Sequence, residues 1–129
     1  MADSMPVDIE LVEGDEFLES RCLGAYSVAR FKKQLEASVQ ACTQKKLKKL
    51  LLDITGISSY EPNELDRFEI GQFAAKISEG LSKVAGLAGP EQLGRKMFEI
   101  QVARNRGLLI KGFVDRRAAV EWLTGAKTR

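Results

Sequence analysis

Histidine is absent from this chain of 129 residues, and cysteine occurs only twice, as Cys22 and Cys42. Without histidine the chain has no imidazole for general acid or base catalysis, and it lacks the commonest metal ligand. Two cysteines cannot build a disulfide framework, and we expect two reduced, buried thiols. These absences exclude Ser-His and Cys-His nucleophilic pairs. We therefore predict a protein that is not an enzyme, with no catalytic residue, no metal and no cofactor.

Long apolar runs are also missing, because stretches such as residues 50–52 are far shorter than the roughly 20 residues that cross a bilayer. The first residues lack the basic and apolar regions of a signal peptide. No repeat, low-complexity segment or Gly/Ser linker interrupts the chain. We therefore expect one cytoplasmic domain over residues 1–129, with its core within about 7–125, and no membrane span.

Charge is nearly balanced, at +2, but it is unevenly placed along the chain. Residues 1–25 carry seven acids and one arginine, whereas residues 90–129 carry nine bases and four acids. An acidic start and a basic end predict complementary faces that join two copies in a homodimer or hold a charged protein partner. The basic residues have neither interleaved aromatic residues nor a nucleic-acid motif, so we expect no nucleic acid as a partner.

Hydrophobic periodicity predicts alternating strands and helices. Apolar and acidic residues alternate over 7–11, which is typical of a strand with one buried face, and residues 13–15 supply a turn into a second strand at 16–23. Further strands are expected at 50–54, 83–87 and 108–114, and helices at 27–45, 62–80, 90–107 and from 115 onward. The order ββαβαβαβα predicts an α/β fold with a mixed, mostly parallel sheet and helices packed on it.

Two of these elements carry more specific expectations. The segment 50–54 is an apolar run between two amphipathic helices, which predicts an interior strand that is buried on both faces. In the helix that begins at Pro90, the residues Leu93, Met97 and Ile100 are expected to form the buried stripe.

The element order and several short motifs resemble the SpoIIAA-like, or STAS-like, domains. The matching pieces are the hairpin turn at residues 13–15, Gly24 after the second strand, the strand end at 51–57 and the tail at 111–123. That tail, a strand followed by Asp and then Glu-Trp-Leu, is typical of an uncharacterised branch related to the anti-sigma-factor antagonists. The resemblance implies the fold and a non-enzymatic regulatory or protein-interaction role, as in bacterial regulation.

The chain departs from the family in the segment that phosphorylation controls. Phospho-regulated antagonists resemble one another in an Asp-Ser-Ser/Ala-Gly segment after the central strand, and residues 58–65 lack both the Asp-Ser pair and the following Gly. A phosphate there would face acids at 61, 64 and 66, which repel it. We therefore expect function without phosphorylation of this segment.

The carboxyl end of the central strand supplies the first set of candidate residues. Ligands of open α/β sheets bind beyond the carboxyl ends of strands, so Asp53, Thr55, Ser58 and Ser59 form a candidate ligand or regulatory loop. The alternative is structural: Asp53 bonds loop amides, and the serines serve turn and capping roles.

The last helix supplies the second set. Trp122, with Arg116 and Arg117, is a candidate protein contact, because tryptophan and arginine are enriched in interface hot spots. The alternative is a tryptophan at the core's edge beside a solvated charged face.

One different function stays open beside the interaction domain. A distantly similar fold in lipid-transfer proteins keeps an apolar pocket against the sheet, so a small-molecule or lipid carrier is the alternative. An interior apolar cavity would favour the carrier, whereas a flat apolar patch with a charged rim would favour the interaction domain.

Overall fold

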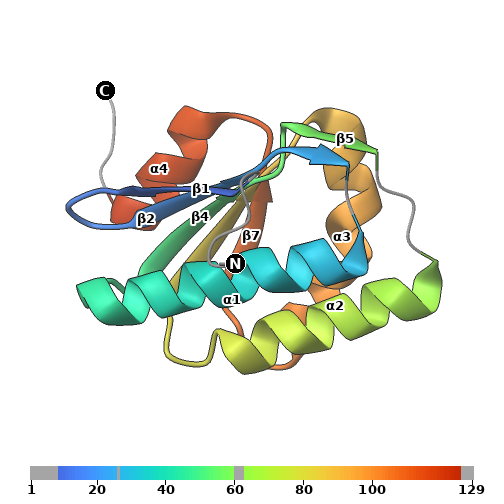
Figure 1. Cartoon of the computed structure of the whole chain (residues 1–129), viewed down its shortest axis with the longest axis horizontal. Helices are drawn as coiled ribbons and strands as arrows, with labels where there is room; N and C mark the ends of the chain where they lie inside the picture. Colours follow the sequence, from blue (N-terminus) through green and yellow to red (C-terminus); the bar gives the residue numbers. More distant parts are fainter. Residues whose placement is uncertain (1–8, 26, 60–62, 126–129) are drawn as a thin grey trace, which may run out of the picture.

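The computed structural model describes residues 9–25, 27–59 and 63–125, and it contains a mixed five-stranded sheet (Figure 1). The strands are ordered β1 (Ile9–Glu13), β2 (Leu18–Cys22), β4 (Lys49–Asp53), β6 (Lys83–Leu87) and β7 (Ile110–Phe113). β1 pairs antiparallel with β2, and every other pair in this sheet is parallel. The predicted α/β class, the mostly parallel sheet and the interior place of residues 50–54 are therefore confirmed.

Four helices follow the strands at the predicted places: α1 (Val28–Lys45), α2 (Glu64–Ile77), α3 (Pro90–Asn105) and α4 (Arg116–Thr124). Ser27 and Asp115 cap α1 and α4, because their side chains accept hydrogen bonds from the amides of Arg30 and Ala118. Helix α2 ends at Ile77, three residues before Gly80. Its proposed start at Pro62 lies outside the described residues.

The helices cover both faces of the sheet, with α4 on one side and α1 and α2 on the other, while α3 packs beside β7 (Figure 1). Side chains of each strand alternate between these faces. Leu50 and Leu52 join the core beneath α1, with Phe31 and Leu35. The intervening Leu51 joins a separate core against α4. Burial on both faces explains why β4 is an almost unbroken apolar run.

Two short strands correct the expectation that Thr55, Ser58 and Ser59 all lie in a loop. β3 (Gly24–Ala25) and β5 (Ile57–Ser59) form a separate two-stranded parallel sheet. Strands of two and three residues are too short to carry a period of alternation, so the sequence pattern does not reveal them.

The opening hairpin also differs from the predicted turn. Glu13 belongs to β1, and the turn follows it, because the Gly14 amide donates to the Phe17 carbonyl at 3.0 Å. The predicted first two strand residues, at 7 and 8, lie outside the described part of the chain.

The buried face of α3 is only partly the predicted one, because Ile100 is buried and Leu93 is partly buried as expected, but Met97 is not. Met97 is 50% exposed, whereas Lys96 and Glu99 are buried beside Ile100. The helix packs against α2 as well as against β7, so its buried face is turned toward α2. At this contact Gly71 of α2 lies against Val102, where an added Cβ would come within 2.7 Å of the Val102 Cβ.

We predict that Gly71→Ala lowers the free energy of unfolding by about 1–3 kcal/mol, since the methyl group would force α2 and α3 apart. The matched control is Gly94→Ala in the exposed interior of α3, where a Cβ meets no atom within 4 Å. That change is expected to raise stability by about 0.5–1 kcal/mol through helix propensity. Urea unfolding of the two variants measures both values, and a shift of the same sign in both would contradict the packing argument.

Candidate functional site

An apolar cavity of about 60 Å³ lies between the sheet and the helices α1, α2 and α3, and we call it the inner cavity. Phe31 comes from α1, Ile70 and Ala74 from α2, and Leu52 and Val84 from the sheet. A cavity needs about 10–15 Å³ of such volume to hold one water molecule, so this one has room for about four to six water-sized groups. The cavity can therefore hold a small group of apolar atoms.

Small residues in the walls leave room for this cavity. Gly86 lies in the middle of β6 and lines the cavity, and a Cβ placed there would meet only the Lys111 carbonyl, at 4.0 Å. Ala74 lines the cavity from α2 and carries only a methyl group. Side chains of strand residues normally fill such an interior to high packing density. The cavity exists because glycine stands where a sheet normally carries a larger residue.

Two charged residues of α3 line this apolar space. Lys96 Nζ lies 3.2 Å from Glu99 Oε2, and the two residues are only 6% and 4% exposed. The ammonium also lies 4.0 Å from the centre of the Phe31 ring, a cation–π contact. Burial of an ion pair gains little stability against its desolvation cost. A few polar residues in the wall of an otherwise apolar cavity are instead typical of a binding site.

The environment changes the protonation of Lys96. Burial lowers the pKa of its ammonium to about 8, although the charge and hydrogen bond of Glu99 oppose the shift. The Arg67 guanidinium on α2 lowers the pKa further by repulsion. A lysine held in this way carries an appreciable share of neutral, nucleophilic amine near neutral pH.

A second polar cluster lies at the other face of the sheet, toward α4. Glu19 of β2 is 3% exposed and accepts hydrogen bonds from Arg116 at 2.6 Å and from Arg21 at 3.1 Å. Arg21 also lies 3.9 Å from Asp53 and 3.5 Å from Glu10. Burial alone would raise the pKa of the Glu19 carboxyl, but the two arginines outweigh it and hold that pKa below its ordinary value. The cluster ties β2, β4 and the start of α4 together.

A search of solved structures finds a similar protein, an uncharacterized protein from the DUF3478 family with a SpoIIAA-like fold, from Shewanella loihica PV-4. The alignment covers 95% of this chain and 98% of that one, with a TM-score of 0.56 and 18% identity. This chain has a SpoIIAA-like fold. No protein-family model and no curated protein matches the sequence.

Within the SpoIIAA-like fold, the candidate loop after β4 adjoins the inner cavity through Ile54, but Asp53 and Thr55 themselves do not line it. The amide and the hydroxyl of Thr55 donate to Asp53 Oδ1 at 2.9 and 2.6 Å, which is the geometry of a carboxylate that stabilises its own loop. Ser58 and Ser59 lie in β5, and their side chains fall outside the described part of the structure. The structure therefore joins Asp53 and Thr55 to Arg116, through Arg21 and Glu19.

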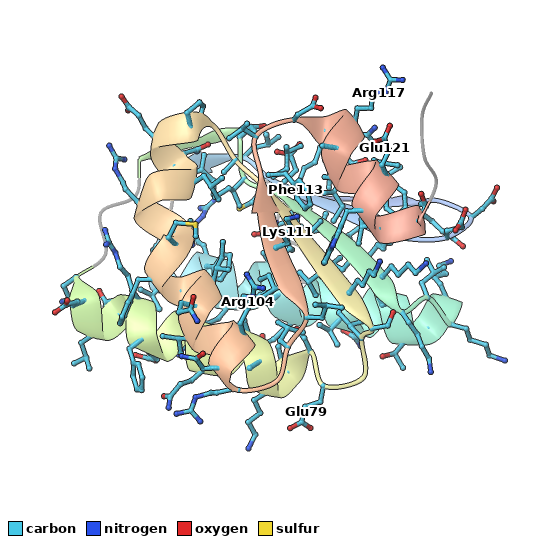
Figure 2. All side chains as sticks on the ribbon, turned by 180° about the vertical axis from the view of Figure 1, so that it is seen from behind. Glu79, Arg104, Lys111, Phe113, Arg117 and Glu121 are labelled. Carbon is cyan, nitrogen blue, oxygen red and sulfur yellow. The ribbon has the colours of Figure 1, made fainter. Side chains whose placement is uncertain are left out.

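Trp122 and Arg117 of α4 occupy different surroundings. Trp122 is half-buried beside Phe113, with ring centres 5.6 Å apart, and Lys83 Nζ lies over its ring and donates to its carbonyl. Arg117 is exposed and pairs with Glu121 one turn further along the helix, at 3.4 Å (Figure 2). These contacts hold Trp122 against the sheet and leave Arg117 at the surface.

Lys96 and Glu99 were not among the residues predicted from the sequence, although the sequence contains a signal for them. With Ile100 and Ala103 they repeat at i, i+3, i+4 and i+7, so one face of the helix contains two charges among apolar residues.

Among the residues that the structure describes, no group of three or more His, Cys, Asp or Glu gathers as a metal site would require. In the same residues, no helix combines the length and apolar character that a membrane crossing needs.

Proposed function

We propose that this SpoIIAA-like domain is a non-enzymatic binding protein that holds a small apolar molecule in the inner cavity. The observation that supports the proposal is the buried Lys96–Glu99 pair in the wall of an otherwise apolar cavity. The ammonium can donate to a carbonyl or hydroxyl oxygen of a ligand, and the carboxylate can accept from a hydroxyl. Apolar walls with a few placed polar groups are the usual design of small-molecule sites.

The size of the cavity sets the size of the ligand. About 60 Å³ is well below the roughly 300 Å³ at which drug-sized pockets begin, so a two- to four-carbon alcohol or carbonyl compound is a better match than a lipid. A larger carrier cargo would require α2 to move, because Ile70 and Ala74 of that helix form one wall.

Gly86→Val tests this function, because the new side chain would occupy the inner cavity without changing the surface. We expect chemical-shift changes on titration with 1-butanol in the wild type, at residues such as Ala74 and Val84. The variant should show an affinity at least about tenfold weaker, which corresponds to about 1.4 kcal/mol. Gly94→Ala, outside the cavity, should bind as the wild type does. Equal binding by Gly86→Val, or no binding of short alcohols and ketones by the wild type, would contradict the proposal.

Protein interaction is the second candidate, and exposed apolar residues on α2 and α3 favour it. Leu65 is 73% exposed, and Phe68, Met97 and Phe98 are 39–50% exposed. Apolar side chains of this size at a surface are typical of contact sites when they adjoin. Because Gly86→Val leaves this surface unchanged, a role in protein contact would survive the substitution, whereas ligand binding would not.

The charge asymmetry gives weaker support to a homodimer. Three acids of the first two strands already pair within the chain: Glu10 with Arg21, Glu13 with Lys45 and Glu19 with Arg116. Fewer acidic groups therefore remain for a second copy than the sequence alone suggests.

A further inference from the structure

Lys96 has a chemical capacity that simple binding does not use. We propose that its amine captures a short apolar aldehyde or ketone in the inner cavity, as a reversible imine. The inference rests on the proposed function, since the carbonyl compound must first enter the cavity. It deepens that function by assigning both a ligand class and a covalent attachment point.

The geometry places the three groups that the reaction needs in one place. Lys96 lines the cavity, Glu99 Oε2 lies 3.2 Å from Nζ, and the Phe31 ring closes the site 4.0 Å away. A carbonyl carbon in the cavity would lie beside the nucleophile, with apolar walls around its alkyl chain. The carboxylate is within hydrogen-bond distance for proton transfer.

The protonation state of Lys96 supports the same chemistry. At pH 7.5 an amine with a pKa of about 8 is about one-quarter neutral, whereas an ordinary lysine is about one-thousandth neutral. The charged groups that act on Lys96 are Glu99 of α3 and Arg67 of α2, with the Cys22 thiol of β2 nearby and the uncharged Phe31 ring on α1. Burial raises the pKa of Cys22, so this thiol is protonated and does not compete as a nucleophile.

The covalent step balances without an oxidant or reductant. The lone pair of the neutral Nζ attacks the carbonyl carbon, and the electrons of the C=O π bond move to the oxygen, which takes up a proton. Glu99 passes that proton from the nitrogen to the oxygen, and it then passes the second nitrogen proton to the hydroxyl of the resulting carbinolamine. The C–O bond then breaks, water leaves, and a C=N bond forms. The net change is amine plus carbonyl giving imine plus water, and hydrolysis reverses it.

Reductive trapping tests the proposal with butanal and cyanoborohydride on the full chain at pH 7.5, followed by peptide mapping. We expect the butyl group on Lys96 at least about tenfold faster than on the exposed Lys33 and Lys76, with a pH midpoint near 8. Labelling that follows solvent exposure, with Lys96 among the slowest, would overturn the proposal. The measurement needs no variant, so a failure to fold cannot obscure it.

Two further arms separate this inference from the proposed function. Gly86→Val should reduce trapping at Lys96 at least about tenfold and leave Lys33 and Lys76 unchanged; undiminished trapping at Lys96 would overturn capture in the cavity. 1-Butanol cannot form an imine. If it binds the wild type while butanal leaves Lys96 unlabelled, imine capture is wrong and the proposed function stands. If neither compound binds, both are wrong.

Discussion

Glu99→Leu is expected to lower the free energy of unfolding by about 3–5 kcal/mol at pH 7, because it leaves the Lys96 charge in an apolar interior. Glu99 is 4% exposed, so water cannot easily replace its carboxylate. The double variant Lys96→Met/Glu99→Leu removes both charges, and it should recover most of that loss or exceed the stability of the wild type. Urea unfolding of the three proteins measures the coupling between the pair.

The same pair predicts how stability changes with pH. Lys96 has a lower pKa when folded, about 8, than in the unfolded chain, so the folded state binds this proton less tightly. The free energy of unfolding should therefore rise with pH from about 8 to about 10.5, and the double variant should lose this rise. A double variant as unstable as Glu99→Leu would show that packing, and not charge, sets the stability at this position.

Arg21→Met/Arg116→Met is expected to cost about 3–5 kcal/mol at pH 7 as well, since it removes both cations from the buried Glu19 carboxylate. The control is Glu19→Gln. It removes the anion instead, and it should cost less because the Arg21 and Arg116 side chains are 41% and 53% exposed and can turn to water. Urea unfolding measures the loss of stability in both variants. A larger loss in the double arginine variant would show that the cost comes from the buried Glu19 carboxylate when it has no cation partner.

The stability that the double arginine variant loses should depend on pH. The pKa of Glu19 in the wild type is lowered on folding, so its contribution is present above the ordinary pKa of 4.5 and is lost as pH falls through the folded value. In the double arginine variant only burial would remain, which raises the pKa, so lowering the pH should relieve part of the loss. A loss that is the same at pH 7 and pH 4 would contradict this account.

Much of the fold was predictable because local rules and tertiary packing agree. Ser27 and Asp115 marked helix starts, and the apolar run of β4 marked a strand covered on both faces. Prediction from the sequence failed where tertiary contacts determine which residues are buried or paired. α3 is turned toward α2 by the close approach at Gly71, which buries Lys96 in place of Met97. The strands β3 and β5 are too short for periodicity to detect.

The candidate site was less predictable for a related reason. The sequence drew attention to Asp53 and Thr55, because the carboxyl ends of strands commonly carry ligand sites. The inner cavity instead depends on Gly86, which has no side chain, and on the helix residues that pack around it. An isolated glycine in a strand has several explanations, and only the packed structure shows which applies.

Trp122 is a fluorescent probe that reports on one region of the molecule. It is the chain's only tryptophan, and it lies on α4, beside Phe113 and Lys83 and on the opposite side of the sheet from the inner cavity. Its fluorescence therefore reports whether α4 stays docked on β6 and β7. A molecule that binds between α2 and the sheet would leave this emission almost unchanged. Unchanged tryptophan fluorescence during a titration therefore does not exclude binding in the inner cavity.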